Sequence, residues 1–320
     1  MFLNNKLVIF TFVLILIVLL INPSSLFSED NNKIIQYKSG DKKHLLNHDG
    51  QERKYVVHLP DNYSKLKIKF PVVIYVHGGG GSIKAAYADG IDKMSDKYGF
   101  ILAIPNSTKV KHGPMGNCWN GGRWKGGECC GSADDVGFIS KMIDEIKQNY
   151  NVDDKRIYAM GISNGGLMTN RLACELSDKI AAIATVAPAA ILENCHPKKH
   201  VPIMNIHGTL DPCNPFDGSV PKNFCARVPY KRMSPEEVVN TWKKINGCTN
   251  KSVNYYSKGK ASCQIYNQCK DNSEVVFCID KGMGHTWPGG AQYFPAFLVG
   301  PVSKDITTEQ IWNFLKKHKL

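Results

Sequence analysis

A serine between glycines is the residue of this 320-residue sequence best suited to chemistry. The stretch "GISNGG" at 161–166 follows a short apolar segment and leads into one with helical spacing of apolar residues. A serine hydroxyl becomes a nucleophile when a base takes its proton and a third group orients the base. Such serines sit on sharp strand-to-helix turns. The pattern predicts Ser163 as a nucleophile, with a plain glycine-rich turn as the alternative.

An acidic residue downstream stands where the third group belongs. The apolar segment 201–206 reads as a buried strand, and "HGTLDP" at 207–212 follows it directly. In sheet enzymes with this kind of serine turn, the acid comes after the serine and before the histidine. Asp211 is therefore the predicted acid. The competing interpretation is an aspartate that only forms a turn before Pro212.

Two histidines compete for the role of base. His285 lies in the glycine-flanked loop "GMGHTWPGG" at 282–290, after the apolar segment 274–279. A histidine on such a loop is free to reach the serine, and His285 is the predicted base. His207 ends a strand instead, so we expect it to form structural hydrogen bonds that support the loop carrying Asp211.

Backbone amides that stabilise a developing oxyanion are the remaining requirement. The segment 70–76 is apolar and leads into "HGGGG" at 77–81, where glycines allow close backbone approach to a substrate. We assign the oxyanion hole to the amides of Gly79 and Asn164. A phosphate-binding loop is the alternative, but the P-loop lysine and the GxGxxG pattern are both absent from the sequence.

Short apolar segments alternate with amphipathic ones along the chain, which indicates an α/β fold with a mostly parallel central sheet and helices on both faces. In such sheets ligand sites lie at the carboxyl ends of the strands. The strands are expected at 54–59, 71–76, 101–104, 156–160, 180–186, 201–206 and 274–279. The helices are expected at 83–98, 134–150, 163–176, 235–245 and 305–317.

Several motifs occur together in an order that resembles one known family. They are "HGGGG" at 77–81, "DDVGF" at 134–138, "GISNGG" at 161–166, "ACE" at 173–175, "HGTLDP" at 207–212 and "GMGHTWPGG" at 282–290. This is similar to the polyhydroxybutyrate depolymerase and feruloyl esterase family of secreted α/β-hydrolase carboxylesterases. The resemblance covers roughly residues 50–318 and implies the same nucleophile, acid and base, and we expect one catalytic domain over 29–320. Asp135 is expected in the first turn of a helix that Ser132 caps.

The resemblance also implies the substrate class: polyhydroxybutyrate-type polyester oligomers, or feruloyl and acetyl esters of polysaccharides. Aromatic residues fall in the loops expected at the site, and we expect Trp287 and Trp119 to bind substrate. Those aromatic residues are Trp119, Trp124, Trp287, Tyr293, Phe294 and Phe297.

Two other classes of protein compete with an esterase. A non-catalytic carbohydrate- or surface-binding protein on a hydrolase scaffold would have lost a triad member, whereas all three are present. A serine peptidase would need a feature that recognises peptide termini, and the sequence shows none. The formal charge of +12 comes from scattered lysines without an aromatic-basic repeat, which argues against nucleic acid. We expect a monomer that needs no metal or cofactor.

The N-terminus is expected to carry an export signal. Lys6 precedes the apolar run 7–21, which is short for a membrane span and typical of a signal peptide, expected to occupy 1–28. An uncleaved anchor, which would place the protein at a membrane, is the alternative.

Eleven cysteines, all after the apolar run, point to an oxidising compartment and to several disulfides. We expect a secreted protein, extracellular or periplasmic. For adjacent Cys129 and Cys130, two separate bridges are favoured over a vicinal pair. The resemblance suggests a further bridge among Cys248, Cys263, Cys269 and Cys278.

Overall fold

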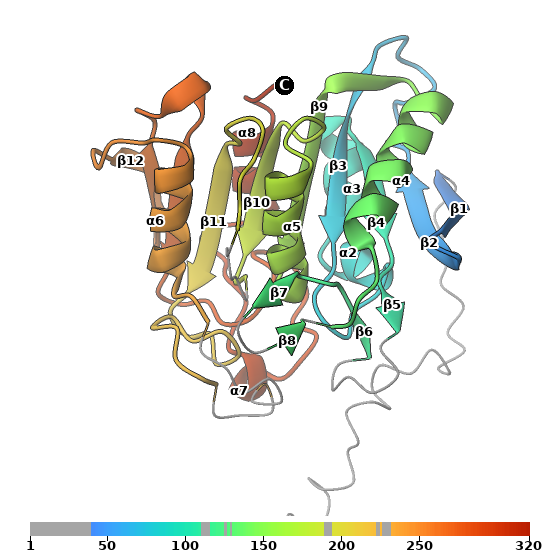
Figure 1. The fold of residues 1–320 in the computed structure, drawn as a ribbon. Coiled ribbons are helices and arrows are strands. Elements are labelled where there is room, and N and C mark those ends of the chain that lie inside the picture. The colour runs from blue at the N-terminus through green and yellow to red at the C-terminus, as the bar shows by residue number, and fades with distance from the viewer. Residues whose placement is uncertain are drawn as a thin grey trace, which may run out of the picture.

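The computed structural model describes residues 40–109, 116–124, 127–128, 130–188, 194–221, 225 and 232–320. The signal peptide predicted for 1–28, and the first residues of the domain predicted for 29–320, lie outside these ranges. A ten-stranded sheet runs through the molecule in the order β1-β2-β4-β3-β9-β10-β11-β14-β13-β12. Figure 1 shows helices in front of it and behind it.

Six neighbouring strands in the middle of the sheet are parallel. Parallel strands covered on both faces read as continuous apolar runs, which is why the sequence predicts all six. They are β4 (Ile101–Pro105), β3 (Phe70–Val76), β9 (Val152–Ile162), β10 (Ala182–Val186), β11 (Ile203–Gly208) and β14 (Val275–Asp280).

Antiparallel strands extend the sheet on both sides. The pair β1 (Asp41–His48) and β2 (Gln51–His58) joins through β2 to β4. The pair β13 (Ala261–Tyr266) and β12 (Val253–Lys258) joins through β13 to β14. Two small ribbons lie apart from the sheet, formed by β5 (Thr108–Lys109) with β6 (Asn117–Cys118) and by β7 (Arg123–Trp124) with β8 (Gly127–Glu128).

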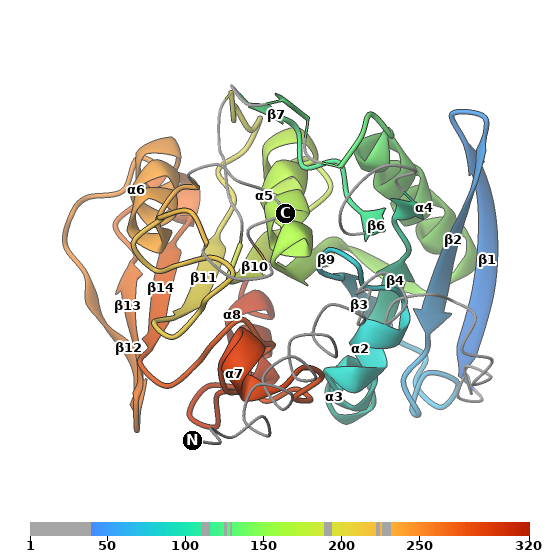
Figure 2. The same cartoon turned by 90° about the horizontal axis from the view of Figure 1, so that it is seen from below.

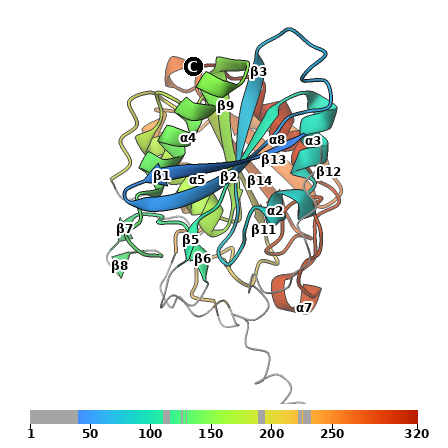
Figure 3. The same cartoon turned by 90° about the vertical axis from the view of Figure 1, so that its right-hand side faces the viewer.

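The helices form a layer on each face of the sheet, as the side view in Figure 3 shows. One layer holds α4 (Asp135–Asn149), α5 (Asn164–Glu175) and α6 (Pro235–Ile245), and the other α2 (Lys84–Ala88), α3 (Ile91–Tyr98) and α8 (Thr308–Leu315). Two short elements lie outside these layers, the 3₁₀ turn η2 (Lys270–Asn272) and α7 (Ala296–Val299). The fold is the predicted α/β arrangement.

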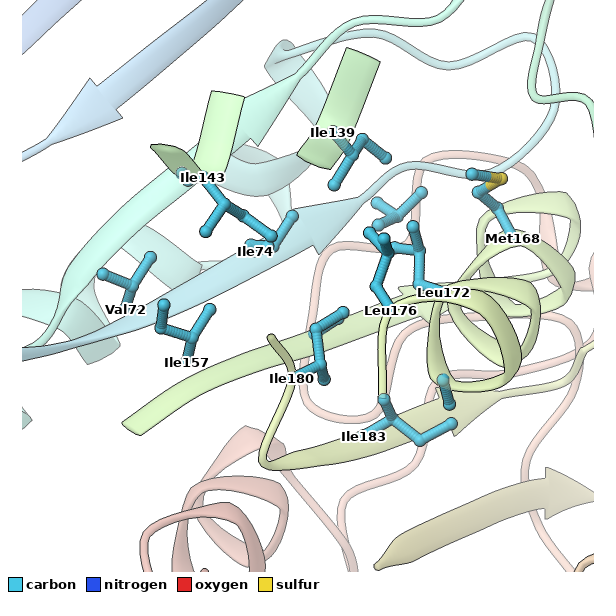
Figure 4. Packing of buried hydrophobic residues seen from close by; sticks show 14 of the residues in the cluster. Val72, Ile74, Ile139, Ile143, Ile157, Met168, Leu172, Leu176, Ile180 and Ile183 are labelled. Carbon is cyan, nitrogen blue, oxygen red and sulfur yellow. The ribbon is translucent and has the colours of Figure 1, made fainter. Parts of the chain in front are cut away.

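Each layer buries its own apolar cluster against the sheet. Figure 4 shows part of the first, in which Ile139 and Ile143 from α4 and Leu172 from α5 face Ile74 of β3 and Ile157 of β9. All five side chains are at most 2% exposed. Burying such a side chain contributes roughly 1.5–3 kcal/mol, so this cluster fixes β9 and α5 relative to each other.

Local signals explain where the helices begin. Ser234 caps α6 in a reciprocal pair with Glu237, and Pro235 occupies the first turn. The helix α4 begins one residue later than expected, because Asp134 accepts a hydrogen bond from the Gly137 amide. The expectation that Ser132 caps α4 is therefore wrong. The single helix expected at 83–98 is two helices, since Gly90 adopts a left-handed conformation with φ 70° between them.

The carboxyl ends of the parallel strands meet along one edge, at the bottom of Figure 1 and facing the viewer in Figure 2. His77 follows β3, Ser163 follows β9, Asp211 lies after β11, and His285 lies after β14. The sheet therefore brings the four predicted loops to the same edge.

Among the described residues, no helix is long and apolar enough to cross a membrane.

Candidate active site

Ser163 occupies a strained turn between β9 and α5, with φ 58° and ψ −122°. A non-glycine residue keeps such a conformation only where its surroundings enforce it, and it is a mark of functional sites. Its amide donates to the Val186 carbonyl at 2.9 Å. A Cβ on Gly165 would lie 2.1 Å from the Val76 carbonyl oxygen, and one on Gly161 would lie 2.6 Å from the Gly165 oxygen. Both flanking glycines are thus required by close backbone packing.

Asp211 and His285 form the pair that a nucleophilic serine needs. His285 Nδ1 lies 2.8 Å from Asp211 Oδ2, which leaves Nε2 of the imidazole for another partner. The other carboxylate oxygen accepts from the amides of Cys213 and Asn214, both at 2.8 Å. Burial raises the pKa of Asp211, but the charge of His285 and these hydrogen bonds outweigh burial and leave the pKa lowered. Asp211 is therefore an ionised acceptor for His285.

The backbone around His285 is held by the segment that carries α7. The His285 amide donates to the Val299 carbonyl at 2.5 Å, and the Gly284 amide donates to the Pro301 carbonyl at 2.8 Å. A Cβ on Gly284 would lie 2.2 Å from the Val299 oxygen. The side chain of His285 is 14% exposed, compared with 2% for His207. Of the two histidines, His285 is the one open to solvent.

The glycine loop at 77–81 lies against the nucleophile. A Cβ on Gly78 would come within 3.5 Å of Ser163 Cβ. His77 is buried, and burial lowers its pKa to about 4, so it is a neutral donor to the Gly78 carbonyl at 2.8 Å. Asn117 holds the other end, accepting from the Gly80 amide at 2.6 Å. Asn117 is a positioning residue that no sequence signal marked.

Asn164 ties this loop region to the turn through its side chain. Its Oδ1 accepts from the Trp119 amide at 2.8 Å, and its Nδ2 donates to the Trp119 carbonyl at 3.0 Å. Trp119 Nε1 in turn donates to the His77 carbonyl at 2.9 Å. The backbone of Gly79 lies between these anchored residues. The predicted oxyanion amides of Gly79 and Asn164 thus belong to loops that the structure holds beside Ser163.

Both predicted substrate-binding tryptophans are in the core. Trp119 and Trp287 are each 0% exposed. Trp287 Nε1 donates to Thr308 Oγ1 at 2.8 Å, and its ring packs edge-on against Tyr75 with centroids 5.3 Å apart. A substrate cannot touch these indoles, which contradicts the expectation that they line the site. Their role is to pack the loops that carry the site.

Asp135 also has a structural role, as the sequence indicated. It lies in the first turn of α4 and is fully buried. Its carboxylate accepts from the Asn120 amide at 2.7 Å and from the Arg53 guanidinium at 2.5 Å. The "DDVGF" motif therefore fixes the segment that includes Trp119.

Five disulfides join the described cysteines, and two of them, Cys118–Cys130 and Cys213–Cys225, lie in loops of the site edge. Cys118 pairs with Cys130, which confirms the preference against a vicinal bridge to Cys129, itself outside the described residues. The four C-terminal cysteines, among which one bridge was expected, form two bridges. The remaining pairs are Cys174–Cys195, Cys213–Cys225, Cys248–Cys269 and Cys263–Cys278.

One group of side chains near the site has the spacing of a metal centre. Ligand atoms of Asp211, Cys213 and His285 lie within 4.8 Å of one another. The Cys213 sulfur is bonded to Cys225, however, and Asp211 is already hydrogen-bonded to His285. A disulfide sulfur is not the thiolate that metals prefer, so these residues do not fit a metal ion.

The chain is similar in sequence to proteins named as esterases. It is 33% identical over 248 residues to "Feruloyl esterase B" of Piromyces equi, covering 73% of this chain and 42% of that protein. It is 27% identical to "Putative esterase NocK" of Nocardia uniformis subsp. tsuyamanensis, covering 81% of this chain and 77% of that one. The chain spans less than half the length of the Piromyces protein.

A solved structure shares the architecture. The acetyl xylan esterase from Aspergillus awamori aligns with a TM-score of 0.58 and 15% identity, covering 86% of this chain and 99% of that chain. At this identity the likeness shows the fold, which is that of α/β-hydrolases. The sequence profile of the family described as "Esterase PHB depolymerase" matches residues 54–226, more than half of the chain. The chain belongs to the esterase PHB depolymerase family.

Proposed function

We propose that this protein is a secreted carboxylesterase in which Ser163, His285 and Asp211 form a catalytic triad. The observation that carries the proposal is the 2.8 Å hydrogen bond between His285 and the buried Asp211 carboxylate, at the edge where Ser163 occupies its strained turn. The family match and the esterase relatives support the same reaction.

In the proposed reaction the Ser163 oxygen attacks the ester carbonyl while His285 Nε2 takes its proton. Asp211 holds His285 through Nδ1 and stabilises the imidazolium that forms. The amides of Gly79 and Asn164 donate to the oxyanion. The imidazolium returns its proton to the alcohol as it leaves, and a water molecule activated by His285 then releases the acid from Ser163.

Exposed apolar side chains next to the acid and the base support a substrate with an apolar or aromatic part. Leu210, directly before Asp211, is 51% exposed, and Phe297 of α7 is 85% exposed. Tyr293, on the segment between His285 and α7, is 44% exposed. The names of relatives from Piromyces and Aspergillus flavus, both called feruloyl esterases, favour an aromatic acyl group over a polyester.

Location outside the cytoplasm is part of the proposal. Five disulfides fit an oxidising compartment and would be unusual in a reducing one. The apolar run 7–21 supplies the signal for export. Mass mapping without reduction should find the five pairs, whereas free thiols throughout would contradict export.

The test of the function is turnover of p-nitrophenyl acetate by the wild type and by Ser163→Ala, His285→Ala and Asp211→Asn variants. Each variant should lose several orders of magnitude in kcat. Ser177→Ala, a serine just beyond the C-terminal end of α5 and away from this edge, serves as control. Wild-type turnover by Ser163→Ala would overturn the proposal. A panel of feruloyl, acetyl and 3-hydroxybutyrate esters then identifies the acyl group by kcat/KM.

A further inference from the structure

His207 is a second imidazole at the acid of the proposed triad. It lies in β11 and is 2% exposed. Its Nε2 lies 2.8 Å from the Asn214 carbonyl and 3.5 Å from Asp211 Oδ2, the same oxygen that binds His285. We propose that His207 is a positioning residue, whose single N–H fixes the 211–214 turn and the orientation of the Asp211 carboxylate. This inference rests on the proposed function.

The surroundings of His207 determine which nitrogen carries its proton. Nε2 faces two oxygen acceptors, so the proton resides there, while Nδ1 is buried and has no hydrogen-bond partner within the described part of the chain. Burial lowers the pKa of His207 more than the nearby Asp211 carboxylate raises it. A neutral His207 can donate to the turn without competing with His285 for the charge of Asp211. A second imidazolium would compete for it.

The turn that His207 holds is the one that aims the carboxylate. Asp211 Oδ1 is fixed by the amides of Cys213 and Asn214. Asn214 is itself anchored by its Nδ2, which donates to the Ala187 carbonyl at 2.6 Å, one residue beyond the Val186 that accepts from Ser163. The bond from His207 to the Asn214 carbonyl closes the turn from the side of β11. The nucleophile and acid loops therefore share supports.

Loss of this N–H should weaken proton transfer and leave substrate binding unchanged. The buried Asn214 carbonyl would lose its donor and the turn would be free to rotate. A displacement of about 1 Å at a catalytic group costs up to roughly 100-fold in rate. The imidazolium of His285 would also lose part of its counter-charge, so the acidic limb of the kcat/KM profile should move to lower pH.

A matched pair of substitutions separates the N–H from the bulk of the ring. Gln places an amide N–H where Nε2 lies, and Asn places one where Nδ1 lies. His207→Gln should keep kcat for p-nitrophenyl acetate within about fivefold of wild type. His207→Asn and His207→Leu should lose about 30-fold in kcat, with KM within about twofold and the acidic limb displaced downwards. Thermal melting followed by circular dichroism sets an assay temperature at which all variants are folded. Urea unfolding compares their free energies of unfolding.

The outcomes distinguish this inference from the proposed function. If Ser163→Ala is inactive while His207→Asn keeps the wild-type kcat and acidic limb, the positioning role is overturned and the triad stands. Equal impairment of the Gln and Asn variants, with an unmoved acidic limb, also overturns it, because ring bulk alone would then matter. Turnover by Ser163→Ala would instead overturn the proposed function.

Discussion

Asp89 should make the folded protein lose stability as the pH rises towards neutrality. This carboxyl group is 3% exposed, and Tyr75 donates a hydrogen bond to its Oδ2. Its Oδ1 has no hydrogen-bond partner in the described part of the chain, and a Cβ on Gly290 would lie 2.6 Å from it. Burial raises the pKa of Asp89 to about 7, far more than the bond from Tyr75 lowers it.

The magnitude follows from the two states of the chain. In the unfolded chain Asp89 titrates near 3.8, so between pH 4 and pH 7 the unfolded chain has lost a proton that the folded protein keeps. Stability then falls by about 1.4 kcal/mol for each pH unit, and by about 4 kcal/mol over the whole interval. Above pH 7 both states are ionised, and the contribution of Asp89 no longer changes.

The assay is urea unfolding of wild type and Asp89→Asn between pH 5 and pH 8.5, with disulfides intact. The Asn side chain still accepts from Tyr75 and cannot ionise. Subtracting the variant's unfolding free energy from that of the wild type cancels the histidines, including His58. This difference should fall by about 2 kcal/mol from pH 5 to pH 7 and level off by about pH 8. A difference that is flat or that rises with pH would refute the reasoning.

Three further predictions concern packing, charge and substrate. Gly165→Ala should cost at least about 3 kcal/mol in unfolding free energy, because the added methyl group meets the Val76 carbonyl. Gly78→Ala should unfold like wild type but lose at least about tenfold in kcat/KM, because its methyl group lies beside Ser163. Burial lowers the pKa of His58, but Asp41 and Asp96 outweigh burial and raise it. The stabilisation that protonated His58 gives the folded protein is therefore complete below pH 6.5 and is lost as the pH rises through the folded pKa. His58→Leu should lower the unfolding free energy by roughly 3 kcal/mol at pH 6 and by less at pH 9. Phe297→Ser should raise KM for a feruloyl ester about fivefold and leave an acetyl ester unaffected, whereas Ile68→Ser, exposed just before β3 at the opposite edge, should change neither. Calorimetry checks that both serine variants are folded. An equal KM change for both esters would count against the Phe297 contact.

Apolar runs predict the central strands, and the ends of these strands predict where the site residues lie. The six parallel strands are buried on both faces, so each is recognisable without knowledge of its neighbours. The outer strands are different. β12 has largely exposed residues and β1 has only one buried one, so their sequences resemble loops, and only pairing with β13 and β2 makes them strands.

Some residues of the candidate site could likewise be predicted from the sequence, and others could not. Ser163, Asp211 and His285 each follow a recognisable strand, which is enough to place them at one edge. The burial of the tryptophans does not follow from the sequence, because an indole in an aperiodic loop gives no sign of its packing partners. Trp287 is buried, and its Nε1 donates to Thr308 of α8, a contact distant in sequence that no local pattern could reveal. The role of Asn117 in holding the glycine loop likewise depends on contacts distant in sequence.

The central claim is that Ser163 is the nucleophile, and a covalent label tests it most directly. Incubation with diethyl p-nitrophenyl phosphate should add one diethylphosphoryl group per chain, release one nitrophenolate and abolish turnover. Peptide mass mapping should find the group on Ser163, and the Ser163→Ala variant should remain unlabelled. Labelling of that variant to the same extent, or an adduct on another residue in the inactivated wild type, would contradict the claim.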